Sequence, residues 1–154
     1  MMRSFVAVTA APLLVIAALS VARHEPVLAQ TADAAAPADP VARLGRQLER
    51  GGTSLEYRPG SGFLSSLLGH LDIAVDSQVL VFSKTSFQHQ QISPRAPRAI
   101  FFNDSVAVGS VQNGDVLDMM SLEPAQGFVF YTLNARQSEA PSFERRGTDC
   151  VFCH

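Results

Sequence analysis

The chain has 154 residues, with 12 lysines and arginines against 14 acidic residues, and its formal net charge at pH 7 is −2. It has no basic stripe and no alternation of aromatic with basic residues, which argues against nucleic-acid binding.

The first 29 residues have the three parts of a secretory signal peptide. Residues 1–3 are a short basic start, residues 6–21 are rich in alanine, valine and leucine, and residues 27–29 end on a small residue. The apolar run of roughly 16 residues is short for a membrane-spanning helix, and a retained N-terminal anchor is the alternative. No cysteine lies directly after this run, so a lipid-modified N-terminus is not indicated. We expect a periplasmic or otherwise exported protein that is cleaved after Ala29.

Cleavage leaves about 125 residues, enough for one domain with a modest core. Residues 30–39 are rich in alanine, proline and aspartate and lack apolar periodicity, which predicts a flexible linker.

Two short helices are predicted next. Asp39 can cap the first helix, Pro40 suits its first position, and the glycine pair at residues 51–52 ends it. Its apolar face consists of Val41, Leu44 and Leu48. Apolar residues at helical spacing over residues 63–71 predict the second helix.

The remaining elements are predicted to be strands. Residues 79–82 are continuously apolar and indicate a strand buried on both faces, whereas the polar residues 83–98, with two prolines, indicate a long irregular loop.

An antiparallel meander of about four strands should follow, which makes the fold class α+β. Its strands are expected at residues 99–102, 106–111, 116–122 and 128–133. Asn113-Gly114 is typical of a type I′ turn, in which both central residues have positive φ. Residues 141–149 indicate a polar, arginine-bearing connection.

The pattern Cys150-Val151-Phe152-Cys153-His154 is typical of covalent haem attachment. Two thiols at this spacing can add to the two vinyl groups of haem, and the adjacent histidine can bind the iron. We therefore expect covalently attached haem c, anchored at Cys150 and Cys153, with its iron bound by His154.

The same motif also occurs in zinc sites and in dithiol oxidoreductases. A structural zinc site needs about four protein ligands, and the sequence has no other cysteine. Export favours haem c, because that cofactor is attached outside the cytoplasm. A dithiol or disulfide at Cys150 and Cys153 stays open as an alternative.

A haem has two faces and long edges that need apolar cover, and in cytochromes much of that cover follows the attachment motif. We therefore expect the sequence to be the N-terminal portion of a longer protein, in which residues 150–154 begin a truncated cytochrome c region.

Three further stretches carry a resemblance to a known family: QVLVFSKTSFQ at residues 78–88, PRAIFFND at 97–104 and GFVFYTL at 127–133. Together with the cysteine motif, they resemble the N-terminal region of a family of large, poorly characterised exported bacterial cytochrome c domain proteins. The resemblance spans residues 55–154 and implies thioether links at Cys150 and Cys153 and iron ligation by His154.

Four other side chains are candidates for a sixth iron ligand: Met119, Met120, His70 and His89. Met119 and Met120 are neighbours in a predicted strand, so at most one of them can face a haem, and core packing is the simpler interpretation. We expect His70 to interact with the dipole at the end of the second helix, and His89 to be solvated.

Two arginines, a lysine and a serine are further candidate functional residues. Arg145 and Arg146 can pair with haem propionates, although solvated loop charges are the simpler interpretation. Lys84 and Ser86 would suit a hydrolase, but no Gly-x-Ser-x-Gly context surrounds Ser86.

The predicted organisation is a signal peptide (1–29), a flexible linker (30–39), an α+β accessory domain (40–149) and the start of a haem-binding region (150–154). The predicted function is that of an exported c-type cytochrome that exchanges electrons with an unknown redox partner. One alternative is a haem-dependent oxidoreductase, either peroxidase-like or a multihaem reductase. Another is a non-haem binding module with a C-terminal disulfide or dithiol. Membrane association is expected only if the N-terminal segment is retained.

Overall fold

The computed structural model describes residues 38–147. The predicted signal peptide, most of the predicted linker, and Cys150, Cys153 and His154 lie outside the described residues. The predictions for those segments stay predictions.

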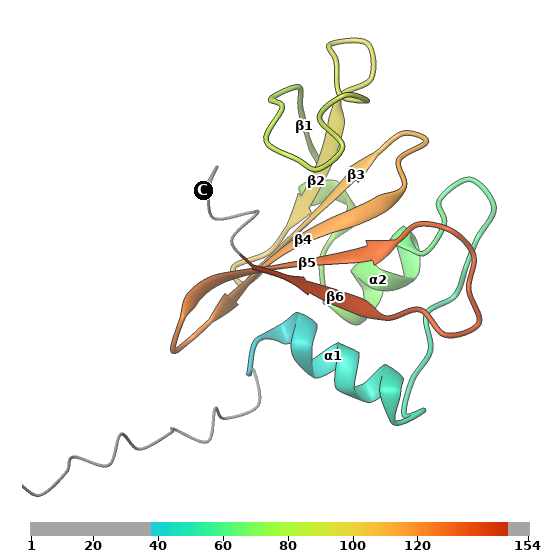
Figure 1. The fold of residues 1–154 in the computed structure, drawn as a ribbon, viewed down its shortest axis with the longest axis vertical. Coiled ribbons are helices and arrows are strands. Elements are labelled where there is room, and N and C mark those ends of the chain that lie inside the picture. The colour runs from blue at the N-terminus through green and yellow to red at the C-terminus, as the bar shows by residue number, and fades with distance from the viewer. Residues whose placement is uncertain (1–37, 148–154) are drawn as a thin grey trace, which may run out of the picture. The chain divides into compact units, whose positions relative to one another are not determined.

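The described residues form a layer of two short helices on one face of a six-stranded antiparallel sheet (Figure 1). The helices are α1 (Pro40–Glu49) and α2 (Leu64–His70), and a 3-10 turn, η1 (Val75–Ser77), follows them. The strands are β1 (Val79–Val81), β2 (Arg98–Phe102), β3 (Val106–Val111), β4 (Val116–Glu123), β5 (Gly127–Asn134) and β6 (Phe143–Arg146). Their order in the sheet is their order in the sequence, so the predicted α+β meander is confirmed.

Helix α1 begins and ends where local signals place it. The Asp39 carboxylate accepts hydrogen bonds from the backbone N–H groups of Val41 and Ala42, each at 3.1 Å, and Pro40 occupies the first position. Gly51 has a φ of 67° after the last turn. The N–H of Gly51 donates to the carbonyl of Leu48, and that of Gly52 to the carbonyl of Gln47. This pair of bonds is a Schellman motif, in which a left-handed residue satisfies the last helix carbonyls.

Alternation along the strands divides the sheet into two faces. One face packs against both helices and forms the main core, and the other carries no helix. The core members from the sheet are Phe101, Val106, Val108, Leu117, Met119, Val129, Tyr131 and Leu133. The helices and the segments next to them contribute Val41, Leu44, Leu55, Phe63, Leu67, Leu68, Leu71 and Ile73. The open face is therefore the part of the sheet where a functional surface is to be sought.

Three sequence predictions about the strands are wrong. Residues 79–82 are not a strand buried on both faces, because β1 lies at the edge of the sheet with Leu80 60% exposed. The polar connection predicted over residues 141–149 contains β6, which pairs with β5 and extends the meander. The turn after β3 is not type I′, since Asn113 has a positive φ of 58° whereas Gly114 does not.

A buried polar network joins the start of α1 to the sheet. The Tyr131 hydroxyl of β5 donates to the second carboxylate oxygen of Asp39 at 2.8 Å. The Glu123 carboxylate at the end of β4 accepts from the backbone N–H groups of Ala38 at 2.8 Å and Asp39 at 3.0 Å. Asp39 and Glu123 are both buried. Burial, followed by the hydrogen bond to Asp39, raises the pKa of Tyr131 well above its usual value near 10.

Within residues 38–147 no helix has the length and apolar character needed to cross a membrane.

The substitution Asp39→Ala should lower the free energy of unfolding by about 2–4 kcal/mol, because it removes a helix cap and leaves the buried Tyr131 hydroxyl without its acceptor. Urea denaturation followed by circular dichroism measures this loss. Asp115→Ala is the matched control, since its carboxylate is 68% exposed and its ion pair with Arg136 is long, at 3.8 Å. In the Tyr131→Phe background the effect of Asp39→Ala should shrink. An equal loss in both backgrounds would contradict the network.

The raised pKa of Tyr131 predicts a loss of stability at alkaline pH. Above pH 10 the unfolded chain releases the Tyr131 proton while the folded protein keeps it, so stability falls as pH rises, by up to about 1.4 kcal/mol per pH unit. Denaturation curves at pH 8 to 11 test this. In the Tyr131→Phe protein, the part of the stability loss that comes from this hydroxyl should be absent. Parallel pH profiles for the two proteins would be the opposite result.

Candidate functional site

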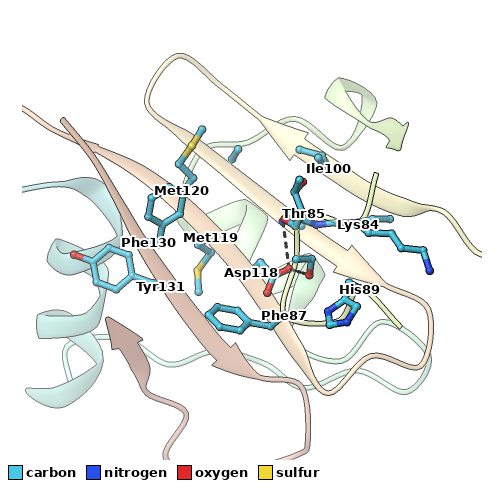
Figure 2. A pocket seen from close by; sticks show the side chains of 14 residues that line it. Lys84, Thr85, Phe87, His89, Ile100, Asp118, Met119, Met120, Phe130 and Tyr131 are labelled. Atoms are coloured by element: carbon cyan, nitrogen blue, oxygen red, sulfur yellow. Dashed lines mark hydrogen bonds and ion pairs between the residues drawn. The ribbon is translucent and has the colours of Figure 1, made fainter. Parts of the chain in front are cut away.

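The open face of the sheet bears a cavity of about 380 Å³, roofed by the connection from β1 to β2 (Figure 2). The floor is apolar and the far end is polar. The floor residues are Ile100, Ala107, Met120 and Phe130, and the polar end is formed by Arg98 and Asp118. The roof is contributed by residues between Lys84 and His89. Such a cavity, mostly apolar with a few convergent polar groups, is typical of a small-molecule site.

An ion pair closes the polar end of the cavity. Arg98 Nη2 lies 3.2 Å from Asp118 Oδ2, and their side chains are only 13% and 12% exposed. The Ser86 hydroxyl donates to the same carboxylate oxygen at 2.7 Å, and Arg98 Nη1 donates to the carbonyl of Thr85 at 3.3 Å. A buried pair of this kind needs such additional hydrogen bonds to offset its loss of hydration.

Gly109 of β3 makes room for the arginine. A Cβ at this position would overlap the guanidinium of Arg98. The guanidinium therefore lies flat against the strand, where another residue would push it out of reach of Asp118. Two buried polar atoms of the pair, Arg98 Nε and Asp118 Oδ1, have no hydrogen-bond partner among the described residues.

The roof is held in place by a glutamine that acts as an extra strand partner. The buried Gln88 donates from its amide to the carbonyl of Val116 at 2.9 Å and accepts from the N–H of Val116 at 3.3 Å. Gly114 leaves space for this amide, since a Cβ there would collide with it. Ile92 of the same connection is buried but lies outside the main core. The loop predicted as irregular has no strand or helix, yet it is fixed on the sheet.

The last described strand reaches the same cavity. The Arg146 guanidinium lies over the Phe87 ring, 5.0 Å from its centroid, and its Nε donates to the Thr132 hydroxyl at 3.0 Å. Arg146 also forms an ion pair with Glu144 at 2.8 Å. Arg145 points to the other side of β6 and donates to the Gln126 side chain at 2.7 Å. Both arginines therefore lie in a strand and not in a loop, which corrects the prediction; Arg145 is exposed as expected, whereas Arg146 is partly buried.

The open face continues past the roof as a surface that we call the apolar patch, which shares Ala107, Met120 and Phe130 with the floor of the cavity. Its residues are Phe102, Ala107, Met120, Leu122, Phe128 and Phe130. The register places Phe102 opposite Ala107, Ala107 opposite Met120, and Met120 opposite Phe130, so these four form one row across the sheet. Leu122 and Phe128 pair in the adjoining position. Phe102, Leu122 and Phe128 are 45%, 41% and 61% exposed.

Three of the four candidate iron ligands, Met119, Met120 and His89, line the cavity, whereas His70 does not. Met119 and Met120 point to opposite faces as predicted: Met119 belongs to the buried core, and Met120 to the patch. His89 is exposed, as expected, and borders the cavity. His70 is the last residue of α2, and its ring hydrogen-bonds with the carbonyl of Ser54 at 3.1 Å, away from the cavity.

Ser86, Asp118 and His89 all line the cavity, but they are not arranged as a hydrolytic triad. The serine hydroxyl donates directly to the aspartate, without a histidine between them. The described residues contain no group of three or more histidine, cysteine, aspartate or glutamate side chains placed to hold a metal ion.

Asp118→Ala should cost about 3 kcal/mol of folding free energy, because it leaves the charge of Arg98 buried without a partner. Removing both charges with Arg98→Met and Asp118→Leu should cost clearly less than the single change. Thermal and urea denaturation of the three proteins provide the comparison. If the double variant were the least stable, the ion pair itself would be a net stabilising interaction, and this interpretation would be wrong.

Comparison with known proteins adds nothing to this geometry, since no protein-family model, no curated protein and no solved structure matches the chain.

Proposed function

We propose that the protein is an exported c-type cytochrome that binds haem covalently and passes single electrons to a redox partner. Cys150 and Cys153 are the anchors, and His154 is the proximal iron ligand. The observation that carries the proposal is the Cys150-Val151-Phe152-Cys153-His154 motif behind an export signal.

The side chains of the cysteine motif suit covalently attached haem c. Two thiols separated by two residues suit thioether formation, and an adjacent imidazole suits iron ligation. When bound, haem c supplies one-electron oxidation and reduction at its iron. The contribution of the protein is to hold the group, to exclude water from it and to set its potential through the surrounding polarity.

The position of the motif supports the proposal. Gly147 follows β6 directly and is three residues before Cys150. A chain of three residues spans at most about 11 Å. Cys150 is therefore at most about 11 Å from Gly147, so described residues near the end of β6 are within reach of a group attached to it.

The cavity supports a second candidate function, a haem-dependent oxidoreductase of the peroxidase-like kind. A volume of about 380 Å³ over an apolar floor is within the range of small organic ligands. A protein that only carries electrons does not need a cavity for an organic ligand.

Production of the chain in a bacterial host with the c-type maturation system tests the proposal. We expect a band that stains for haem after denaturing electrophoresis, because thioether-linked haem survives denaturation. Cys150→Ala with Cys153→Ala should abolish the stain. His154→Ala is the control that keeps both thioether positions and should change the visible spectrum instead.

The same preparation should be found in the periplasmic fraction, with a mass that corresponds to cleavage after Ala29. An unstained band from a competent host would disprove covalent haem binding. Peroxide-dependent oxidation of a phenolic donor, well above the rate of free haem, would favour the second candidate over the first.

A further inference from the structure

We propose that the apolar patch on the open face of the sheet is the surface against which the haem carried by residues 148–154 packs. This inference rests on the proposed function. In this arrangement, one face of the haem is covered by the side chains of Phe102, Ala107, Met120, Leu122, Phe128 and Phe130.

The patch is the part of the open face that the rest of the described chain leaves exposed. The helices cover the opposite face, and the connection from β1 to β2 lies over Arg98 and Asp118 and borders Ala107, Met120 and Phe130. Phe102, Leu122 and Phe128 stay between 41% and 61% exposed. Contiguous apolar surface of this kind marks a binding surface, because leaving it in water is unfavourable.

The direction in which the chain leaves β6 indicates which group covers the apolar patch. Strand β6 is antiparallel to β5, and Arg146 lies opposite Phe130. A chain that leaves β6 after Arg146 therefore begins its path beside Phe130 and on the Phe128 side of it. Cys150 follows Gly147 within about 11 Å, which brings a group linked to its sulfur within reach of Phe128 and Leu122.

The chemistry of the patch suits a flat apolar macrocycle. Three of its six members are phenylalanines, whose rings stack on planar aromatic groups. From β2 to β5 the patch spans three strand spacings, about 14 Å. The row across the sheet ends at Arg146, whose guanidinium can pair with a propionate at the edge of the macrocycle.

Nuclear magnetic resonance of the oxidised holoprotein tests the contact directly. Unpaired electron density at ferric iron shifts and broadens the signals of nearby nuclei. Relative to the haem-free Cys150→Ala, Cys153→Ala protein, we expect the methyl signals of Ala107, Met120 and Leu122 to shift or disappear. The methyl signals of Leu80 should not change, since this side chain is 60% exposed but points to the opposite face in edge strand β1.

The reduction potential gives a second measurement that does not depend on any activity. Leu122→Ser and Phe128→Ser should each shift the potential to lower values, because a more polar cover favours the more highly charged ferric form. Leu80→Ser is the matched control and should leave the potential unchanged. Both patch side chains are largely exposed, so neither change threatens the fold.

The outcomes separate the two proposals. Absence of haem stain in the parent chain would disprove the proposed function. A stained protein in which Leu80 shows the paramagnetic effect instead of the patch would overturn this inference alone. The inference would also be overturned if a second copy of the chain covered the patch. In that case the protein would be a dimer, and Leu122→Ser would dissociate it without changing the reduction potential.

Discussion

The structure depends on a single buried carboxylate, that of Asp39. One of its oxygens caps α1, and the other accepts the hydroxyl of Tyr131 in β5. Glu123 of β4 accepts from the backbone N–H groups of Ala38 and Asp39, so β4 and β5 are both tied to the start of α1. Helices α1 and α2 both pack on the same face of the sheet and leave the other face without a helix. The open face, with its cavity and its apolar patch, is the consequence.

Much of this arrangement follows from local sequence signals. The cap at Asp39, the proline after it and the glycine pair after α1 each act within a few residues, so the sequence predicts α1 correctly. The strands of the meander are similarly local, because each pairs with its neighbour in the sequence. The α+β class and the four central strands could therefore be predicted without any knowledge of long-range contacts.

The sequence predictions are wrong for elements whose structure depends on their position in the sheet. The apolar residues 79–82 look like a central strand, and only the order of strands shows that β1 is at an edge. Strand β6 consists of Phe-Glu-Arg-Arg, whose polar composition is typical of a loop, yet β5 offers it a free edge. The cavity could not be predicted either, because Arg98 and Asp118 meet only through the register of three strands. The cysteine motif, by contrast, is recognised by its spacing alone, and it lies outside the described residues.

Strand order also has a consequence for how the chain acquires this fold. Pairing between successive strands closes only short loops, which favours rapid folding of the sheet. The bonds from Asp39 to Tyr131 and from Glu123 to the N–H of Asp39 instead join residues 92 and 84 positions apart. Helix α1 emerges first during synthesis but acquires these partners only after β4 and β5 have been made. Strand β6 is the last strand in the sequence, so the sheet can be completed only after the C-terminal end of the described region has been synthesised.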